Sequence, residues 1–235
     1  ILILNKWCYM PGRQYNLPFK QSLIPLVFFV FLTPWLSDWD LGLSHFFFRK
    51  NAFLSNFFLD AIFHYAIFPA WGVVLLSCLL LLVSFFSPSW KKWQRGALAC
   101  ILTLAIGSGL LIHAVFKENW GRPRPKQVIT FGGTEPFSPY YQPHFFASLP
   151  AKSFPAGHPS MGFFFFIFIE LGRFYGSSKL TWMGWGLAFC LGLLLGLGRI
   201  AQGGHFLSDV LASGLIMWWS SLFCSWLLLS PQREF

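Results

Sequence analysis

Charged residues are scarce in this sequence of 235 residues: 11% are Asp, Glu, Lys or Arg, and only 8 are acidic. A soluble domain usually has about 25% charged residues, whereas 55% of this chain is hydrophobic and 20% is aromatic. The shortage of charge excludes an ordinary water-soluble domain. It indicates that much of the surface faces lipid.

Cysteine is also rare, with 5 residues and no CxxC spacing. Four of the cysteines lie inside apolar runs: Cys78, Cys100, Cys190 and Cys224. This pattern excludes a disulfide framework or a cysteine-based zinc site and is typical of small buried apolar residues. The apolar core of a signal peptide is missing as well, because Lys6, Arg13 and Lys20 interrupt the first 20 residues. No cleavable signal peptide is therefore expected.

The basic residues outnumber the acidic ones, 17 to 8, which gives a formal net charge of +9. They form short clusters between apolar runs and no basic stripe on a polar domain, so nucleic-acid binding is not indicated. Loops that face anionic headgroups account for part of the excess. An anionic substrate accounts for the rest.

Six apolar runs approach or meet the length of about 20 residues that a membrane-spanning helix needs. They cover residues 22–37, 65–87, 96–116, 159–172, 180–198 and 206–230. The sequence therefore predicts an all-α integral membrane bundle of six transmembrane helices, in a single domain that covers residues 1–235. The segment between the first two runs, LGLSHFFFRKNAFLSNFFLDAIF, combines helical spacing of Phe and Leu with charges and predicts an amphipathic interfacial helix.

The placement of Lys and Arg favours both termini inside, chiefly through the short basic loop WKKWQR at residues 90–95. Because the spans alternate in direction, the ends of the third and fifth runs and the starts of the fourth and sixth meet at one face. Lys117, His158, Arg199 and His205 lie at these four places. Helix N-termini attract phosphate through their free N–H groups and dipole, so the sequence predicts an anion pocket there.

Two histidines make this pocket reactive. His205 and Asp209 are four residues apart and share a face of a helix, where a carboxylate can orient an imidazole that attacks phosphorus. His158 is placed to donate a proton to the leaving oxygen. Other interpretations are a helix cap at His158, a structural His205–Asp209 pair, or a metal site made by all three residues. The nearby cations disfavour the metal.

Three segments resemble the signature of a known family. Lys117-ENWGRP-Arg124-Pro125 resembles a KX6RP motif, residues 154–158 (FPAGH) resemble a PSGH motif, and Arg199 with His205 and Asp209 resembles SRX5HX3D. In this order and spacing they resemble the phosphatidic acid phosphatase type 2 superfamily, called PAP2, and the resemblance covers the six spans.

The resemblance implies that His205 is the nucleophile and forms a phosphohistidine, with Asp209 as its partner and His158 as the general acid. It implies a phosphate site made by Lys117, Arg124, Arg199 and the backbone at Ala156 and Gly157. No metal and no cofactor is implied. Ala156 stands where the family has Ser, and Gly198 replaces the Ser before the arginine.

The implied substrate is a phosphorylated lipid of the bacterial inner membrane, hydrolysed at the periplasmic face. The segment GRPRPKQVITFGGTEPF resembles members that act on lipid A, which makes lipid A the favoured substrate. Undecaprenyl diphosphate and phosphatidylglycerophosphate are the competing substrates. A lipid-binding or transport protein without turnover, marked by Ala156, is the alternative of another class. The sequence predicts no oligomeric state.

Overall fold

The computed structural model describes residues 19–145 and 151–230, and within these ranges all named elements are helical. In chain order they are α1 (Phe19–Phe47), α2 (Phe57–Tyr65), α3 (Phe68–Phe86), η1 (Pro88–Trp93), α4 (Gln94–Thr103), η2 (Leu104–Lys117), η3 (Pro125–Gln127), η4 (Ile129–Phe131), α5 (Gly157–Phe163), α6 (Phe166–Tyr175), α7 (Ser178–Ala201) and α8 (Leu207–Leu229). The first 18 residues, which carry the expectation about a signal peptide, lie outside the described residues.

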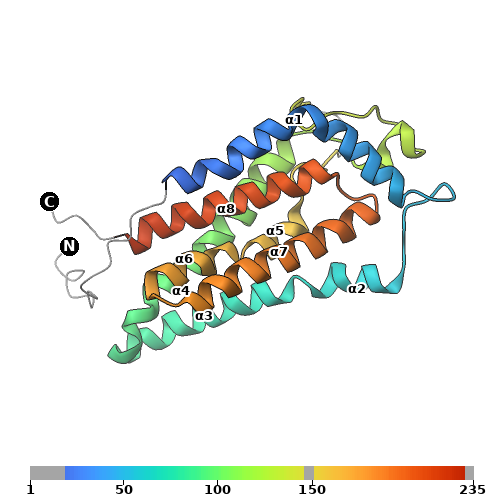
Figure 1. Cartoon of the computed structure of the whole chain (residues 1–235). Helices are drawn as coiled ribbons and strands as arrows, with labels where there is room; N and C mark the ends of the chain where they lie inside the picture. Colours follow the sequence, from blue (N-terminus) through green and yellow to red (C-terminus); the bar gives the residue numbers. More distant parts are fainter. Residues whose placement is uncertain (1–18, 146–150, 231–235) are drawn as a thin grey trace.

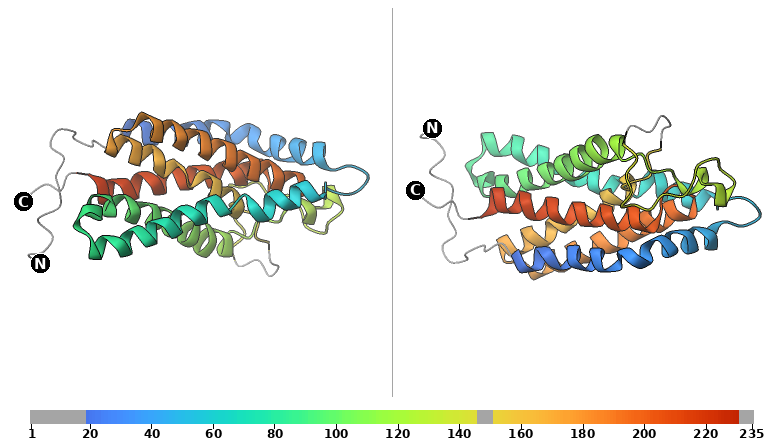
Figure 2. Two further views of the ribbon diagram at one scale, coloured as in Figure 1. Left: turned by 90° about the horizontal axis from the view of Figure 1, so that it is seen from below. Right: turned by 90° about the horizontal axis from the view of Figure 1, so that it is seen from above.

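The long helices run side by side along one axis and form an elongated bundle (Figures 1 and 2). Within residues 19–145 and 151–230, five helical stretches are long and apolar enough to cross a membrane. They are Ser22–Phe47, Phe57–Phe86, Pro88–Lys117, Ser178–Ala201 and Leu207–Leu229. The all-α bundle is confirmed, and the chain is a multi-pass membrane protein.

The predicted fourth run, residues 159–172, forms two short helices, α5 and α6, separated at Phe164 and Phe165. Neither helix is long enough alone to count among the five stretches. Both are mostly enclosed by protein, and Phe164 and Ile167 are fully buried. α5 packs tightly on α7, because a Cβ added to Gly162 would lie only 2.6 Å from the Cα of Gly192.

The predicted first run and the segment after it are arranged differently from the expectation. α1 continues ten residues beyond residue 37, to Phe47. Lys50 and Asn51 then adopt left-handed backbone angles, with φ of 52° and 59°, and break the helix. α2 begins after Asn56, whose side chain accepts a hydrogen bond of 2.9 Å from the Leu59 N–H, which is a typical N-cap. The expected single amphipathic helix is therefore divided between α1, a turn and α2, and α2 continues toward α3 (Figure 1).

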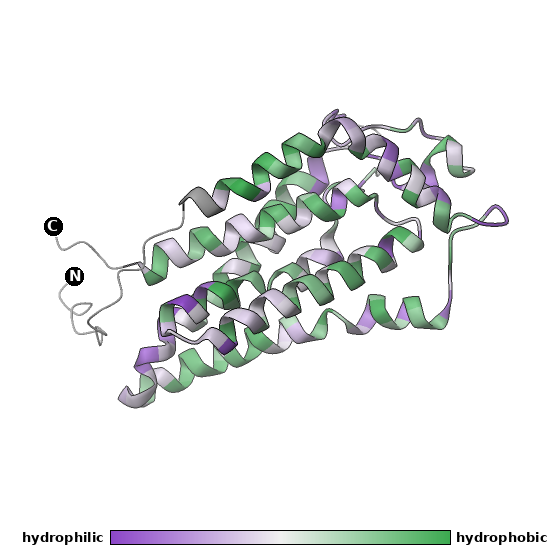
Figure 3. Cartoon of the chain, in the orientation of Figure 1, coloured by the Kyte–Doolittle hydropathy of each residue, from purple (hydrophilic) through white to green (hydrophobic). Residues whose placement is uncertain are grey.

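Residues along the middle of the bundle are mostly hydrophobic, and hydrophilic residues gather toward its ends (Figure 3). Phe28 on α1 is 61% exposed and Leu76 on α3 is 66% exposed. Apolar side chains exposed over several neighbouring helices are expected when the bundle lies in lipid. The segment with the basic cluster of Lys91, Lys92 and Arg95 lies at one end of the bundle, and η2 runs from there toward the other end (Figure 1).

Candidate active site

Four helix ends meet at one end of the bundle: the last turns of η2 and α7 and the first turns of α5 and α8 (Figure 1). Lys117 closes η2, His158 is in the first turn of α5, and Arg199 is in the last turn of α7. His205 precedes α8. The structure thus brings together residues from four separate stretches of the sequence.

Three cations line this end of the bundle: Lys117, Arg124 and Arg199. Each of the two arginines has an unused hydrogen-bond donor. The Nε atoms of Arg124 and Arg199 are buried and have no hydrogen-bond partner among the described residues. A buried charged donor without a partner is costly. Lys117 lies close enough to both arginines for mutual repulsion. Three clustered cations, two of them with an unpaired buried donor, form a site that an anion would complete.

Gly157 lets the backbone approach this cluster closely. A Cβ added there would lie 2.6 Å from His113 Nε2 and 3.1 Å from Lys117 Nζ. A larger residue at this position would therefore displace both side chains. Glycine keeps the start of α5 against the cations.

The imidazole of His205 is held in one orientation. Its Nδ1 lies 2.7 Å from the Ser153 carbonyl oxygen, so Nδ1–H donates to that oxygen and Nε2 carries the lone pair. His205 is 1% exposed. A buried imidazole with its Nε2 lone pair available fits a nucleophile.

Both histidines are held in the neutral form. Burial, with Lys117 and Arg199 adding to it and Asp209 opposing, lowers the pKa of His205 to about 4. Burial and the neighbouring charges of Arg199, His205 and Lys117 lower the pKa of His158 to about 4. At neutral pH His205 therefore retains the lone pair that nucleophilic attack requires.

Asp209 lies behind His205 and is fully engaged by other donors. Its carboxylate accepts from Arg122 Nη1 at 2.5 Å, from Ser153 Oγ at 2.6 Å and from the Phe206 N–H at 2.8 Å. The distance to His205 Nδ1 is 3.8 Å. Asp209 thus acts on the imidazole as a nearby charge, while the Ser153 carbonyl makes the direct hydrogen bond.

The model of the PAP2 superfamily matches residues 98–232. This range is more than half of the chain and contains the cations, both histidines and Asp209. The chain belongs to the PAP2 superfamily.

Three curated relatives share 30% to 38% identity with this PAP2 chain, and each is named "Lipid A 4'-phosphatase". The relative from Francisella tularensis subsp. novicida is 38% identical over 146 residues, which are 61% of this chain and 63% of the relative. The relative from Rhizobium leguminosarum is 34% identical over 143 residues, 56% of this chain and 54% of the relative. The chain thus spans less than two thirds of the length of these relatives. No solved structure matches it.

The buried position of Arg122 behind Asp209 in this PAP2 site was not predicted from the sequence. Arg122 is fully buried and donates to Asp209, to Asp40 Oδ2 at 2.8 Å, to Ser208 Oγ at 2.7 Å and to the Ser138 carbonyl at 2.9 Å. It therefore joins α1 to the start of α8 and holds the Asp209 carboxylate behind His205. Asp40 could have indicated this pairing from the sequence, because an acidic residue next to an apolar run usually needs a cationic partner.

Ala156 does not present a free donor to the pocket. Its N–H donates to the Asp209 carbonyl at 3.1 Å, and its side chain is fully buried. Nearby serines do not supply the missing hydroxyl, because Ser153 Oγ donates to Asp209 and Ser160 Oγ donates to the Gly157 carbonyl at 2.6 Å. In this PAP2 chain the three cations and the start of α5 remain as the groups that could contact an anion.

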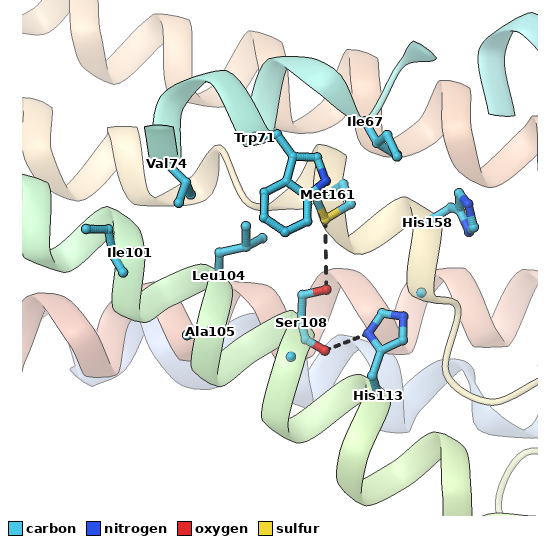
Figure 4. Close-up of a pocket in the computed structure, with 12 residues that line it drawn as sticks. Ile67, Trp71, Val74, Ile101, Leu104, Ala105, Ser108, His113, His158 and Met161 are labelled. Carbon is cyan, nitrogen blue, oxygen red and sulfur yellow. Dashed lines mark hydrogen bonds between the residues drawn. The ribbon is translucent and has the colours of Figure 1, made fainter. Parts of the chain in front are cut away.

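An apolar cavity of about 470 Å³ lies beside the histidines, between α3, the α4–η2 helix and α5. Figure 4 shows Trp71 and Leu104 facing each other across it, with His113 and His158 at one end. His113 is fixed by a 2.7 Å hydrogen bond between its Nδ1 and the Ser108 carbonyl. The cavity is open at the bundle surface, where Trp71 is 53% exposed, and it leads from apolar side chains of α3 and α4 to the polar pocket.

Among the described residues, no group of three His, Cys, Asp or Glu side chains is arranged to hold a metal ion. His158, His205 and Asp209, considered above as an alternative metal site, are not such a group. Asp209 instead directs its oxygens to Arg122, Ser153 and Phe206.

Proposed function

We propose that this PAP2 protein is a metal-independent lipid phosphatase that removes the 4'-phosphate of lipid A through a phosphohistidine on His205. The observation that carries the proposal is the oriented imidazole of His205 beside three cations, two of which have unpaired buried Nε donors. The names of the relatives favour lipid A as the substrate.

In the first step the phosphate lies against Lys117, Arg124 and Arg199, and His205 Nε2 attacks phosphorus. The new P–N bond forms as the P–O bond to the lipid breaks, and His158 gives its proton to the leaving oxygen. The negative phosphate raises the pKa of the neighbouring His158 from its low value in the empty site. Charge that develops on the phosphoryl oxygens is stabilised by the three cations.

In the second step a water molecule attacks the phosphohistidine. His158, now neutral, takes a proton from the water as the P–N bond breaks. Inorganic phosphate leaves, and both histidines return to their starting states. Asp209 and the Ser153 carbonyl hold the His205 ring in place throughout.

The apolar cavity gives a place for hydrocarbon of the substrate. It reaches from Ile101 and Val74 in the bundle to His158 in the pocket, so a chain in the cavity would be continuous with a phosphate on the cations. Sites for lipids and other ligands are typically apolar with a few polar groups at one end.

We further infer six spans, with residues 159–172 as the fourth, crossing in two helical pieces shielded by neighbouring helices. The basic cluster of Lys91, Lys92 and Arg95 at the opposite end favours that end on the cytoplasmic side. The active site would then face the periplasm of a bacterial inner membrane.

The decisive test is phosphate release from a panel of lipid A, undecaprenyl diphosphate and phosphatidylglycerophosphate with a chelator present, with products identified by mass spectrometry. We expect lipid A to lose its 4'-phosphate. Loss of activity on chelation, with recovery on adding a divalent ion, would contradict the metal-independent mechanism. Hydrolysis of only one of the other two lipids would replace lipid A as the proposed substrate. Hydrolysis of no lipid would support the alternative of a lipid-binding or transport protein without turnover.

A bulky side chain in the cavity should slow hydrolysis of a lipid substrate but not of a soluble phosphate ester. Gly109 lines the cavity, and a Cβ there would meet only the Leu104 carbonyl, at 3.9 Å. Gly109→Phe should lower kcat/KM for lipid A on the order of 10-fold, because the ring occupies the hydrocarbon site. Hydrolysis of p-nitrophenyl phosphate should stay unchanged.

Gly72→Phe is the matched control, because a Cβ at Gly72 has no neighbour within 4 Å and Gly72 does not line the cavity. Equal effects of the two substitutions on lipid A hydrolysis would exclude the cavity as a substrate site.

A further inference from the structure

Phe63 on α2 touches two groups of the active site at once. Its ring stacks on the His158 imidazole, with centroids 4.1 Å apart and an interplanar angle of 25°. The guanidinium carbon of Arg199 lies 4.7 Å from the centroid of the same ring. Phe63 lies outside residues 98–232, the range matched by the family model.

A second contact ties α2 to the same arginine. Asp60 Oδ1 accepts a hydrogen bond of 2.9 Å from Gln202 Nε2, and Gln202 Oε1 accepts one of 2.7 Å from Arg199 Nη1. Asp60 and Phe63 are three residues apart on one helix and so share a face. One turn of α2 thus contacts Arg199 directly through Phe63 and indirectly, through Gln202, from Asp60.

We propose that α2 is a positioning element of the active site, in which Phe63 and Asp60 set the orientation of His158 and Arg199. This inference rests on the proposed function. A guanidinium held over an aromatic face keeps its planar fork in a defined direction, and the Nη1 bond to Gln202 leaves Nε of Arg199 unpaired. The stacked Phe63 ring covers one face of His158 and leaves its edge nitrogens available.

The environment of His158 gives a readout that does not depend on turnover. The charged and titratable groups that face it are Arg199 on α7, Lys117 and His113 on η2, and His205 before α8. Together with burial they lower its pKa to about 4. Removal of the Phe63 ring would admit water to one face of the imidazole, and the pKa would rise toward its ordinary value of 6.5.

The test compares Phe63→Ala and Phe63→Tyr with Phe58→Ala, a control on the same helix whose ring is 67% exposed. We expect Phe63→Ala to lower kcat/KM for lipid A on the order of 10- to 100-fold, because misplacement of catalytic groups is costly. Phe63→Tyr keeps the ring and should retain most of the activity. Phe58→Ala should match the wild type.

The second measurement is the His158 pKa, followed by NMR of histidine-labelled protein in detergent and assigned with His158→Gln. It should rise in Phe63→Ala and stay low in Phe63→Tyr and Phe58→Ala. Wild-type kcat/KM together with an unchanged His158 pKa in Phe63→Ala would overturn the inference. If the wild type releases no more phosphate than His205→Asn, the proposed function fails, and the His158 titration alone decides the role of Phe63.

Discussion

Replacing His205 with asparagine is expected to lower phosphate release from lipid A on the order of 10³-fold or more, because the step that forms the P–N bond is lost. Asparagine is the informative choice, since its side-chain NH₂ can still donate to the Ser153 carbonyl that now accepts from Nδ1 at 2.7 Å. The fold around Asp209 should therefore survive. A rate assay with lipid A micelles measures the loss.

The intermediate itself gives a second measurement. Rapid quenching in alkali should trap protein-bound phosphate in the wild type, and this phosphate should be labile to acid, as expected for a phosphohistidine. None should form in His205→Asn. The matched control is His45→Asn on α1, an exposed histidine far along the sequence from the motifs. Activity of His205→Asn within tenfold of the wild type would remove His205 as the nucleophile.

The same variant should change how stability depends on pH. His205 has a folded-state pKa of about 4 against an ordinary value of 6.5, so the unfolded chain binds the proton more readily. The neutral imidazole therefore stabilises the fold above about pH 6.5, and this contribution is lost as the pH falls toward 4. The wild-type Tm should fall over this window, and His205→Asn should fall less. His158 titrates in the same window in both proteins.

The apolar runs predicted the long helices well because membrane burial leaves a strong local signal. Residues 180–198 became α7, Ser178–Ala201, and residues 206–230 became α8, Leu207–Leu229. The meeting of Lys117, His158, Arg199 and His205 also followed from sequence, since alternating helices return every second end to one face. Both inferences depend on patterns that can be read along one sequence: the apolar runs and the alternating direction of successive helices.

Contacts between distant residues left no such pattern. Arg122 and Asp40 are 82 positions apart, and their ion pair was not predicted. The acceptor for His205 is a backbone carbonyl at Ser153, which any residue type provides. The end of α1 was also missed: the apolar run stops at residue 37, directly before Asp38, but the helix continues past Asp40, which pairs with Arg122 inside the bundle.

Arg122→Leu should produce the largest loss of stability in this protein. The arginine is fully buried between Asp40 and Asp209, with ion-pair distances of 2.8 and 2.5 Å. Removing one partner of a buried ion pair typically costs about 3–5 kcal/mol, because the remaining charge is left without compensation. Here two carboxylates would be left. The expected result is a large drop in Tm and in the yield of folded protein, measured by thermal unfolding in detergent.

The matched control is Arg49→Leu, which removes the same charge from an exposed position. It should leave Tm nearly unchanged, because an exposed charge contributes little. Arg122→Lys should recover only part of the stability, since one ammonium cannot replace a fork that reaches Ser138, Asp40 and Asp209 together. Equal Tm values for Arg122→Leu and Arg49→Leu would show that the buried network is not required.

The effects of Arg122 on stability and on activity can be distinguished by also removing the Asp40 carboxylate. In Arg122→Leu with Asp40→Leu, one of the two uncompensated charges is gone, so Tm should rise above that of Arg122→Leu. Activity should stay low, because Asp209 still lacks the arginine that fixes it behind His205. Recovery of wild-type turnover in the double variant would show that Arg122 supports only the fold. If the double variant is folded but still lacks turnover, Arg122 is among the residues that position His205.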